Sequence, residues 1–157
     1  MSVQSETDPH ELWALIKECR FPVITTRASE GGLHSQPVAL CNRDGDSLEF
    51  LWFLMPKRSE PADDLLWDSA VGLTFVRQVP QRYIAVFGSA VVIEDSNLKR
   101  QLWSSMQEGF PAAQSWFPSG NCDPSVALIR LKVIRADCWD TEQHTVTHLF
   151  SPRPPGI

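Results

Sequence analysis

Residues 47–61 read SLEFLWFLMPKRSEP, an apolar run that ends in a cationic turn. If residues 47–54 form a strand, the even-numbered side chains from Leu48 to Leu54 share one face, and Leu51 and Phe53 share the other. A strand with one solvated face would alternate apolar and polar residues, so both faces of this strand must be covered. One cover is expected to be the interior of a β-barrel, and the other is a helix, a cofactor or a second subunit.

Other apolar, β-rich segments flank this one, with turn residues between them. The expected strands cover 21–28, 33–41, 47–54, 70–76, 81–94 and 126–139. Short turns containing Gly and Asp join the first three and favour an antiparallel meander. Gly88, midway along the fifth strand, is where a bulge or sharp bend would turn a barrel corner. The pattern therefore predicts a mainly β fold: a six-stranded antiparallel barrel in meander order, closed or nearly closed, with short flanking helices.

Three short helices are expected around this barrel. Asp8 is the predicted N-cap of a helix that ends near Arg20. Ser59 is the predicted N-cap of a second helix over 59–67, with Pro61 in its tolerant first turn. A third helix is capped within 95–97 and runs to about Met106.

Length and composition favour one domain. The 157 residues, 43% of them hydrophobic, suffice for a single core, expected over about 9–141, with 142–157 as a C-terminal tail. The formal charge of −5 lacks the basic excess that nucleic-acid binding needs. No apolar run approaches the ~20 residues that cross a bilayer, and the N-terminus is polar and acidic, so we expect a cytoplasmic protein without a membrane partner.

Catalytic motifs are missing from the sequence: it has no G-x-S-x-G elbow, H-E-x-x-H, P-loop or G-x-G-x-x-G. Asp63 and Asp64 are adjacent acids in a predicted first turn, where acids commonly serve as partners of the helix dipole. Cys41 or Cys122 as a nucleophile would lack a basic partner nearby in sequence. The cysteines are therefore expected to be reduced thiols; they are Cys19, Cys41, Cys122 and Cys138.

His144 and His148 are four residues apart, but the residues between them are β-branched. They indicate a strand or tail with exposed histidines rather than a pair of metal ligands. No metal is expected.

The turn after the apolar run is the candidate binding element. Lys57, Arg58 and the hydroxyl of Ser59 lie where a strand ends and a helix begins, so they and nearby backbone N–H groups would converge on an anion such as a phosphate. The alternative is a solvated loop that is capped in the ordinary way.

Six groups of residues occur along most of the chain, from about Leu12 to Asp140, in the order and spacing of a known family. They are 33–38, 51–54 with Ser59, 83–90, Asp95 through Leu102-Trp103, 116–120 with Asp123-Pro124, and 138–140. The series resembles the general-stress branch of the FMN-binding split barrels related to pyridoxamine 5'-phosphate oxidase.

The resemblance implies a homodimer that shares two flavin sites at its interface. It places Gln36, Pro37 and Val38 at the flavin edge, Phe53, Leu54 and Met55 beside the ribityl chain, and Ser59 at the phosphate. It also implies that Tyr83 reaches the flavin from the partner subunit, and that Trp116 and Trp139 lie near the ring. FMN is the expected cofactor, with FAD as the alternative.

This chain departs from the family pattern in residues that would hold the flavin. Relatives usually carry Arg, Thr and Lys where Gln36, Met55 and Pro61 stand, and each lost charge-assisted hydrogen bond is worth about 1.5–3 kcal/mol. We hypothesise that Lys57 and Arg58 compensate.

These departures leave several functions open. The first is a flavin-binding protein of general-stress type, with flavin-dependent oxidoreductase activity as its enzymatic form. The second is a cofactor-free split-barrel dimer that acts as a ligand-binding or interaction module, and the third is a deazaflavin or haem in the same cleft. Residues 143–148 lack the Arg and His pattern that reads the substrate in the vitamin oxidase, so pyridoxamine phosphate oxidation is not expected.

Overall fold

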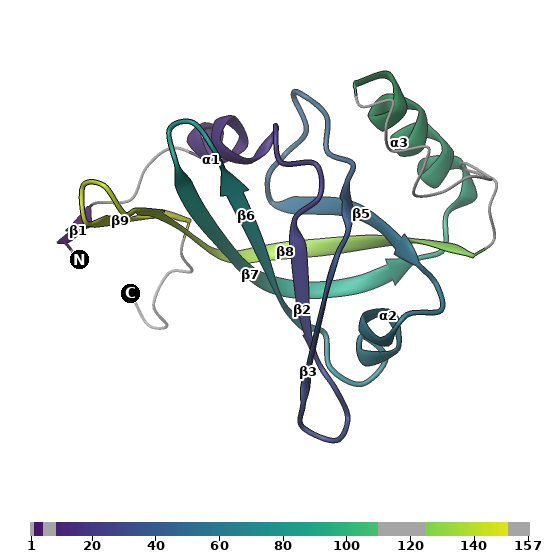
Figure 1. Cartoon of the computed structure of the whole chain (residues 1–157). Coiled ribbons are helices and arrows are strands. Elements are labelled where there is room, and N and C mark those ends of the chain that lie inside the picture. Colours follow the sequence, from purple (N-terminus) through teal and green to yellow (C-terminus); the bar gives the residue numbers. More distant parts are fainter. Residues whose placement is uncertain (1, 5–8, 110–124, 151–157) are drawn as a thin grey trace, which may run out of the picture.

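The computed structural model describes residues 2–4, 9–109 and 125–150. Within these residues the chain forms a curled, mainly antiparallel sheet with short helices around it (Figure 1). The strands are β1 (Ser2–Gln4), β2 (Val23–Arg27), β3 (Leu33–Pro37), β4 (Ala39–Leu40), β5 (Phe50–Pro56), β6 (Ala70–Arg77), β7 (Arg82–Ile93), β8 (Val126–Asp140) and β9 (Thr145–Phe150). The helices are α1 (Pro9–Ile16), α2 (Glu60–Asp64) and α3 (Ser96–Gly109).

The strand pairing closes a barrel. β3 pairs with β2, β2 with β6, β6 with β7, β7 with β8, β8 with β5, and β5 with β4. Because β4 continues β3 after a single residue, Val38, the circuit returns to its start. All six expected strands are present, the second divided at Val38, and the mainly β split-barrel fold is confirmed.

The expected meander order is wrong at one connection. β5 pairs with β8, and the next strand along the chain, β6, pairs with β2 and β7. The chain crosses between these two places through α2, at the lower end of the barrel in Figure 1. A helical connection can span non-adjacent strands, which a tight turn cannot.

The predicted bulge at Gly88 is confirmed. Phe87 and Gly88 pair with Arg135 and Val133, so Ile134 is an extra residue on β8. A Cβ atom on Gly88 would lie 2.1 Å from the carbonyl oxygen of Lys132. Only glycine permits the two strands to approach this closely at the bend.

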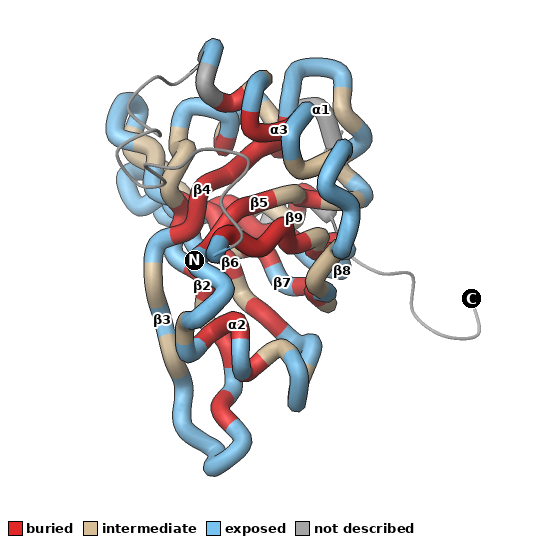
Figure 2. Tube along the Cα trace, turned by 90° about the vertical axis from the view of Figure 1, so that its right-hand side faces the viewer, coloured by how far each residue is buried: buried red, intermediate tan, exposed pale blue. Residues whose placement is uncertain are grey.

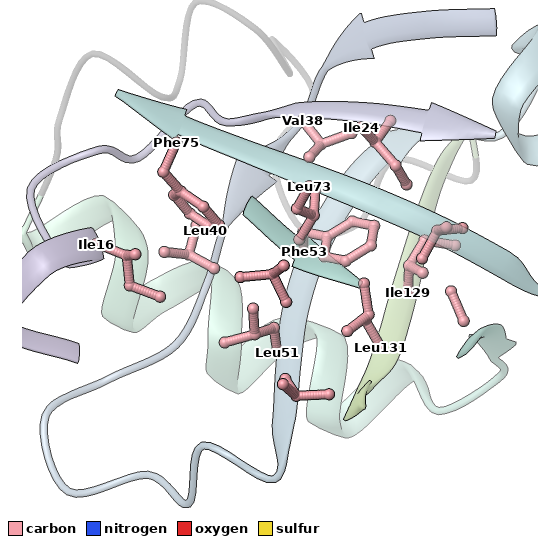
Figure 3. Packing of buried hydrophobic residues seen from close by; sticks show 14 of the residues in the cluster. Ile16, Ile24, Val38, Leu40, Leu51, Phe53, Leu73, Phe75, Ile129 and Leu131 are labelled. Carbon is pink, nitrogen blue, oxygen red and sulfur yellow. The ribbon is translucent and has the colours of Figure 1, made fainter. Parts of the chain in front are cut away.

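The barrel interior holds the main core. Its fully buried side chains come from opposite sides of the barrel and from α1, and they meet at the centre (Figure 3). They include Ile16, Ile24, Leu40, Phe53, Leu73, Phe75, Ile129 and Leu131. Because α1 inserts Leu12 and Ile16, it covers the end of the barrel that the strands leave open.

A helix covers the outer face of β5. Leu102, Trp103 and Met106 of α3 form a second cluster with Leu54 of β5 and with Leu128 of β8, and Trp52 packs against it. The two apolar faces of β5 are therefore explained by the barrel interior and by α3. Of the three covers that the sequence left open for the second face, a helix, a cofactor or a second subunit, the structure has the helix.

The ends of several elements differ from expectation. α1 ends at Ile16 and α2 at Asp64, earlier than predicted, whereas α3 continues to Gly109. Ser59 is the N-cap of α2, as predicted, and Asp95 Oδ1 accepts a hydrogen bond from the backbone N–H of Leu98 at 3.0 Å. The predicted cap Asp8 lies outside the described residues.

The sheet continues past residue 141. β9 pairs with the end of β8 and carries β1 as a parallel neighbour, to the left of the barrel in Figure 1. The β-branched residues between the two histidines thus form a strand, one of the two expected outcomes. Residues 151–157 lie outside the described part of the chain.

Candidate functional site

A groove lies where β3 separates from β5. In the described part of the chain β3 pairs with β2 alone, so its second edge faces the turn between β5 and α2. The groove encloses about 520 Å³, and β3 is exposed or half-buried along its length (Figure 2). We call it the β3–α2 groove; its lining residues are Leu33, His34, Ser35, Gln36, Pro56, Arg58, Ser59, Glu60 and Pro61.

The polar groups at this groove include three of the predicted site residues. Gln36 Nε2 is buried and has no hydrogen-bond partner in the described structure. Arg58 is exposed, and its guanidinium makes no ion pair with any described residue. The hydroxyl of Ser59 donates to the carbonyl oxygen of Pro56 at 2.9 Å and accepts from the N–H of Ala62 at 3.3 Å. Ser59 is therefore occupied by capping, whereas Gln36 and Arg58 have donors to offer.

Most of the predicted apolar contacts point elsewhere. Val38, Phe53 and Met55 are fully buried in the barrel interior, and Leu54 is buried against α3. Pro37, at the end of β3, is exposed. None of these four buried residues lines the groove, so a ligand there would not contact their side chains.

Lys57 and Arg58 diverge. Arg58 lines the β3–α2 groove, but Lys57 lines a separate depression beside the start of α3, together with Glu94, Asp95 and Lys99. Consecutive residues in an extended turn point to different sides of the chain. The two cations therefore do not lie together, which weakens the hypothesis that both compensate for the missing residues.

A hydrogen-bonded cluster at the groove was not anticipated. Asp64 Oδ2 lies 2.7 Å from the Nδ1 atom of His34 and accepts a hydrogen bond from the hydroxyl of Thr26, also at 2.7 Å. The Nε2 atom of His34 forms an ion pair with Glu60. Asp64 is 5% exposed and is hydrogen-bonded within this cluster, whereas the sequence indicated only an ordinary partner of the helix dipole.

Two spacings could have revealed this cluster. Glu60 and Asp64 are four residues apart and share one face of α2. His34 lies directly opposite Thr26 in the β2–β3 ladder, so both side chains project from the same side of the sheet. Neither spacing shows, without the tertiary structure, that the helix face meets the sheet.

His34 and Asp64 each shift the pKa of the other. The hydrogen bond to Asp64 raises the pKa of His34 above its ordinary 6.5; burial opposes this, and the charges of Asp64, Glu60 and Glu30 add to it. Burial alone would raise the pKa of Asp64, but hydrogen bonds from His34 and Thr26 outweigh it and hold that pKa below 3.8. Both shifts favour a carboxylate beside a protonated imidazole.

Tyr83 and Trp139 lie apart from the groove within one chain. They are paired across β7 and β8 and are 38% and 39% exposed. In the sheet order β7 is the third strand after β3, so these two strands lie about 14 Å apart at the usual strand spacing. Trp116, the remaining predicted aromatic, lies outside the described residues.

An apolar depression lies on the outer face of β2, β6 and β7. It encloses about 490 Å³ between residues that include Thr25, Gly72, Ala85, Phe87 and Ile134. Phe87 is 47% exposed, and Leu33, which is 68% exposed, borders both this depression and the β3–α2 groove. A polar groove and an apolar surface thus adjoin at Leu33.

The cysteines and the histidines near the C-terminal strand are weak candidates for catalysis or metal binding. Burial raises the pKa of the Cys41 thiol to about 12, which excludes a thiolate nucleophile there, and Cys122 lies outside the described residues. Cys19, Cys41 and Cys138 are free thiols. His148 pairs with Asp137 at 2.5 Å rather than with His144.

The described ranges contain neither a membrane-spanning helix nor a metal-binding cluster. No helix in them is long and apolar enough to cross a bilayer. In the same ranges, no three His, Cys, Asp or Glu side chains are placed to hold a metal ion.

Solved structures share this fold. A general stress FMN/FAD binding protein from Xanthomonas citri superposes with a TM-score of 0.65 at 23% identity, covering 95% of this chain and 94% of that one. General stress protein 26 from Bacillus anthracis gives 0.66 at 21% identity, with coverage of 83% and 92%. The haem storage protein HutZ from Vibrio cholerae gives 0.61 at 16% identity, with coverage of 79% and 88%.

Sequence comparison identifies the family. Protein bli-3 from Neurospora crassa is 26% identical over 136 residues, which are 81% of this chain and 62% of that protein. The chain thus spans less than two thirds of the length of this relative. A family model described as pyridoxamine 5'-phosphate oxidase like matches residues 7–152. The chain belongs to the pyridoxamine 5'-phosphate oxidase-like family.

Proposed function

We propose that this protein binds a flavin nucleotide, FMN or FAD, with the phosphate in the β3–α2 groove and the ring toward the apolar outer face. The observation that carries the proposal is the junction at Leu33, where the groove with Arg58 and the unpartnered Gln36 amide meets an apolar depression. A flavin nucleotide has the same two parts, an anionic phosphate and a flat ring.

The groove residues fit such a ligand. Arg58 would supply a charge-assisted hydrogen bond to a phosphate oxygen. The buried N–H of Gln36 would gain the acceptor that it lacks, and leaving such a donor unpaired costs about 1–3 kcal/mol. Neighbours of the same fold are named as FMN or FMN/FAD binding proteins.

The proposal includes a second copy of the chain. Tyr83 and Trp139 do not line the groove, and we assign their contact with the flavin to the partner subunit of a homodimer, as the family resemblance implies for Tyr83. The exposed apolar surface around Phe87 and Ile134 is a suitable interface because it adjoins the groove.

A bound flavin would itself supply hydride or electron transfer. The chain's own residues would hold the phosphate, orient the ring and exclude water from one side of it. Flavin-dependent oxidoreductase activity is the enzymatic form of this proposal.

Titration of FMN into the purified protein tests the binding. We expect a yellow complex with stoichiometric quenching of FMN fluorescence, and we expect Arg58→Ala to weaken binding by about tenfold or more. Lys57→Ala is the matched control, because Lys57 faces the other depression and should leave the affinity near that of the parent.

Other outcomes would refute the proposal. A colourless protein that is indifferent to FMN and FAD would instead favour the cofactor-free module. A Soret band on addition of haem, without flavin binding, would favour a haem site. Equal losses for Arg58→Ala and Lys57→Ala would place the phosphate elsewhere.

A further inference from the structure

His34 occupies the wall of the β3–α2 groove in a fixed orientation. It projects from β3 on the same side as Gln36, two residues further along the strand, and both line the groove with Arg58. Its side chain is 27% exposed. One edge of the ring therefore meets the protein, and the other is accessible from the groove.

The buried edge is held by Asp64. The carboxylate accepts from the Thr26 hydroxyl as well as contacting His34 Nδ1, so it is anchored from the sheet and cannot turn away without breaking a buried hydrogen bond. Since a carboxylate only accepts, Nδ1 carries a proton, and the orientation of the imidazole is set. Its Nε2 atom is thereby aimed at Glu60.

Glu60 is the replaceable member of the cluster. Its side chain is 72% exposed, in contrast to the 8% of the Asp64 side chain, and it is the first residue of α2. An exposed ion pair of this kind is worth little in water. Glu60 can therefore swing into solvent while Asp64 keeps the imidazole in place.

We propose that His34 is a further ligand-binding residue of this site: its Nε2–H donates to the anionic phosphate of the bound nucleotide, and Glu60 is the internal acceptor that the phosphate displaces. This inference rests on the proposed function for the identity of the ligand.

The proposal predicts a specific dependence on pH. The charged groups that face His34 are Asp64 and Glu60 on α2 and Glu30 in the β2–β3 turn, all acidic, while Arg58 lines the same groove. Thr26 on β2 does not titrate. The acids favour the protonated imidazole, so the contribution of His34 is complete at acidic pH and is lost as pH rises through its raised pKa.

His34→Gln tests the role of the ring, because glutamine keeps a neutral donor but removes the charge. We expect FMN to bind about tenfold more weakly at pH 6, and riboflavin, which has no phosphate, to bind as in the parent. The ratio of the two FMN dissociation constants should approach one at high pH, which separates His34 from the titration of the phosphate itself. His144→Asn is the matched control, because His144 is exposed in the β8–β9 turn and Asn tolerates its φ of 53°.

Glu60→Gln tests the displacement and should change affinity in the opposite direction. Without the competing carboxylate, FMN should bind several-fold more tightly than to the parent. Unchanged or weaker binding in this variant would overturn the proposal, as would equal losses of FMN and riboflavin in His34→Gln.

A measurement without flavin separates this inference from the proposed function. The imidazole NMR signals of His34 should shift on titration with millimolar inorganic phosphate, and those of His144 should not. A shift without any FMN binding would refute the flavin proposal and retain His34 as an anion ligand. FMN binding with no response of His34 to either compound would refute the present inference alone.

Discussion

Asp64 Oδ2 lies 2.7 Å from the Nδ1 atom of His34, so a single buried carboxylate joins helix α2 to the open edge of the barrel. The same oxygen accepts the hydroxyl of Thr26, which ties the helix to β2 as well. α2 has only five residues and carries Ser59 and Arg58 at its start. Its position relative to β3 therefore defines the groove.

Thr26→Val should loosen this attachment. The substitution preserves the shape of a 1% exposed side chain but removes the hydroxyl that Asp64 accepts. We expect the free energy of unfolding to fall by about 1 kcal/mol, measured as a lower urea midpoint with an unchanged m-value. Thr25→Val is the comparison, because the Thr25 hydroxyl bonds to Ser35 at an exposed site and should matter less. Equal effects of the two changes would contradict a special role for Asp64.

The His34–Asp64 pair should stabilise the fold within a defined pH window. The pKa of His34 is raised, so its contribution is complete below pH 6.5 and is lost as pH rises through the raised value. The pKa of Asp64 is lowered, so its contribution is present above pH 3.8 and is lost as pH falls through the lowered value. The difference in unfolding free energy between the parent and His34→Gln should be largest between these limits. Urea titrations from acid to mildly alkaline pH measure it, and a difference that grows above neutrality would contradict the assignment.

Gly88→Ala should be severely destabilising. The new Cβ would lie 2.1 Å from Lys132 O and 2.7 Å from Leu131 Cδ2, and the backbone oxygen cannot move without breaking the bulge. We expect a loss of about 3 kcal/mol or more, visible as a large drop in Tm. Gly72→Ala is the matched control, since the nearest atoms to its Cβ would be those of the Phe87 side chain and the Val86 carbonyl oxygen, at 3.8–3.9 Å. Similar losses for both glycines would show that strand entropy, not the clash, sets the cost.

Phe87→Asp should prevent dimer formation if the outer face of the sheet is the interface. The side chain is 47% exposed beside Ile134, so the barrel can tolerate a charge there, whereas an apolar interface cannot. Sedimentation velocity should show a dimer for the parent and a folded monomer for the variant. Val79→Asp adds the same charge at an exposed position outside this depression and should remain dimeric. A monomeric parent would refute the dimer itself.

Gln36→Arg should tighten FMN binding. It introduces the guanidinium that the family resemblance implies at this position and places it in the groove with Arg58, where a charge-assisted bond to phosphate would add about tenfold in affinity. Gln36→Met, of similar length but without a donor, should bind more weakly than the parent. Fluorescence titration distinguishes these results, and an arginine variant that binds no better than methionine would place the phosphate away from Gln36.

Local patterns predicted the barrel because each of its strands carries its own signal. Alternating and continuous apolar runs are properties of neighbouring residues, and so are the Ser59 cap and the bend at Gly88. Strand pairing was harder to predict: that β5 pairs with β8 depends on contacts between residues more than seventy positions apart, such as Phe53 with Ile129.

The sequence by itself determined the strands, the helix starts and the cationic turn, since these follow from side-chain size, polarity and backbone preference within a few residues. Only the tertiary structure decided that α3 covers the second face of β5 and that Asp64 is buried against His34. It also decided that Lys57 and Arg58 line different depressions. The physical reason is that burial and hydrogen bonding between distant segments depend on how the barrel places them in space. Asp63 and Asp64 are chemically identical neighbours in the chain, so the sequence does not show which of the two carboxylates will be buried.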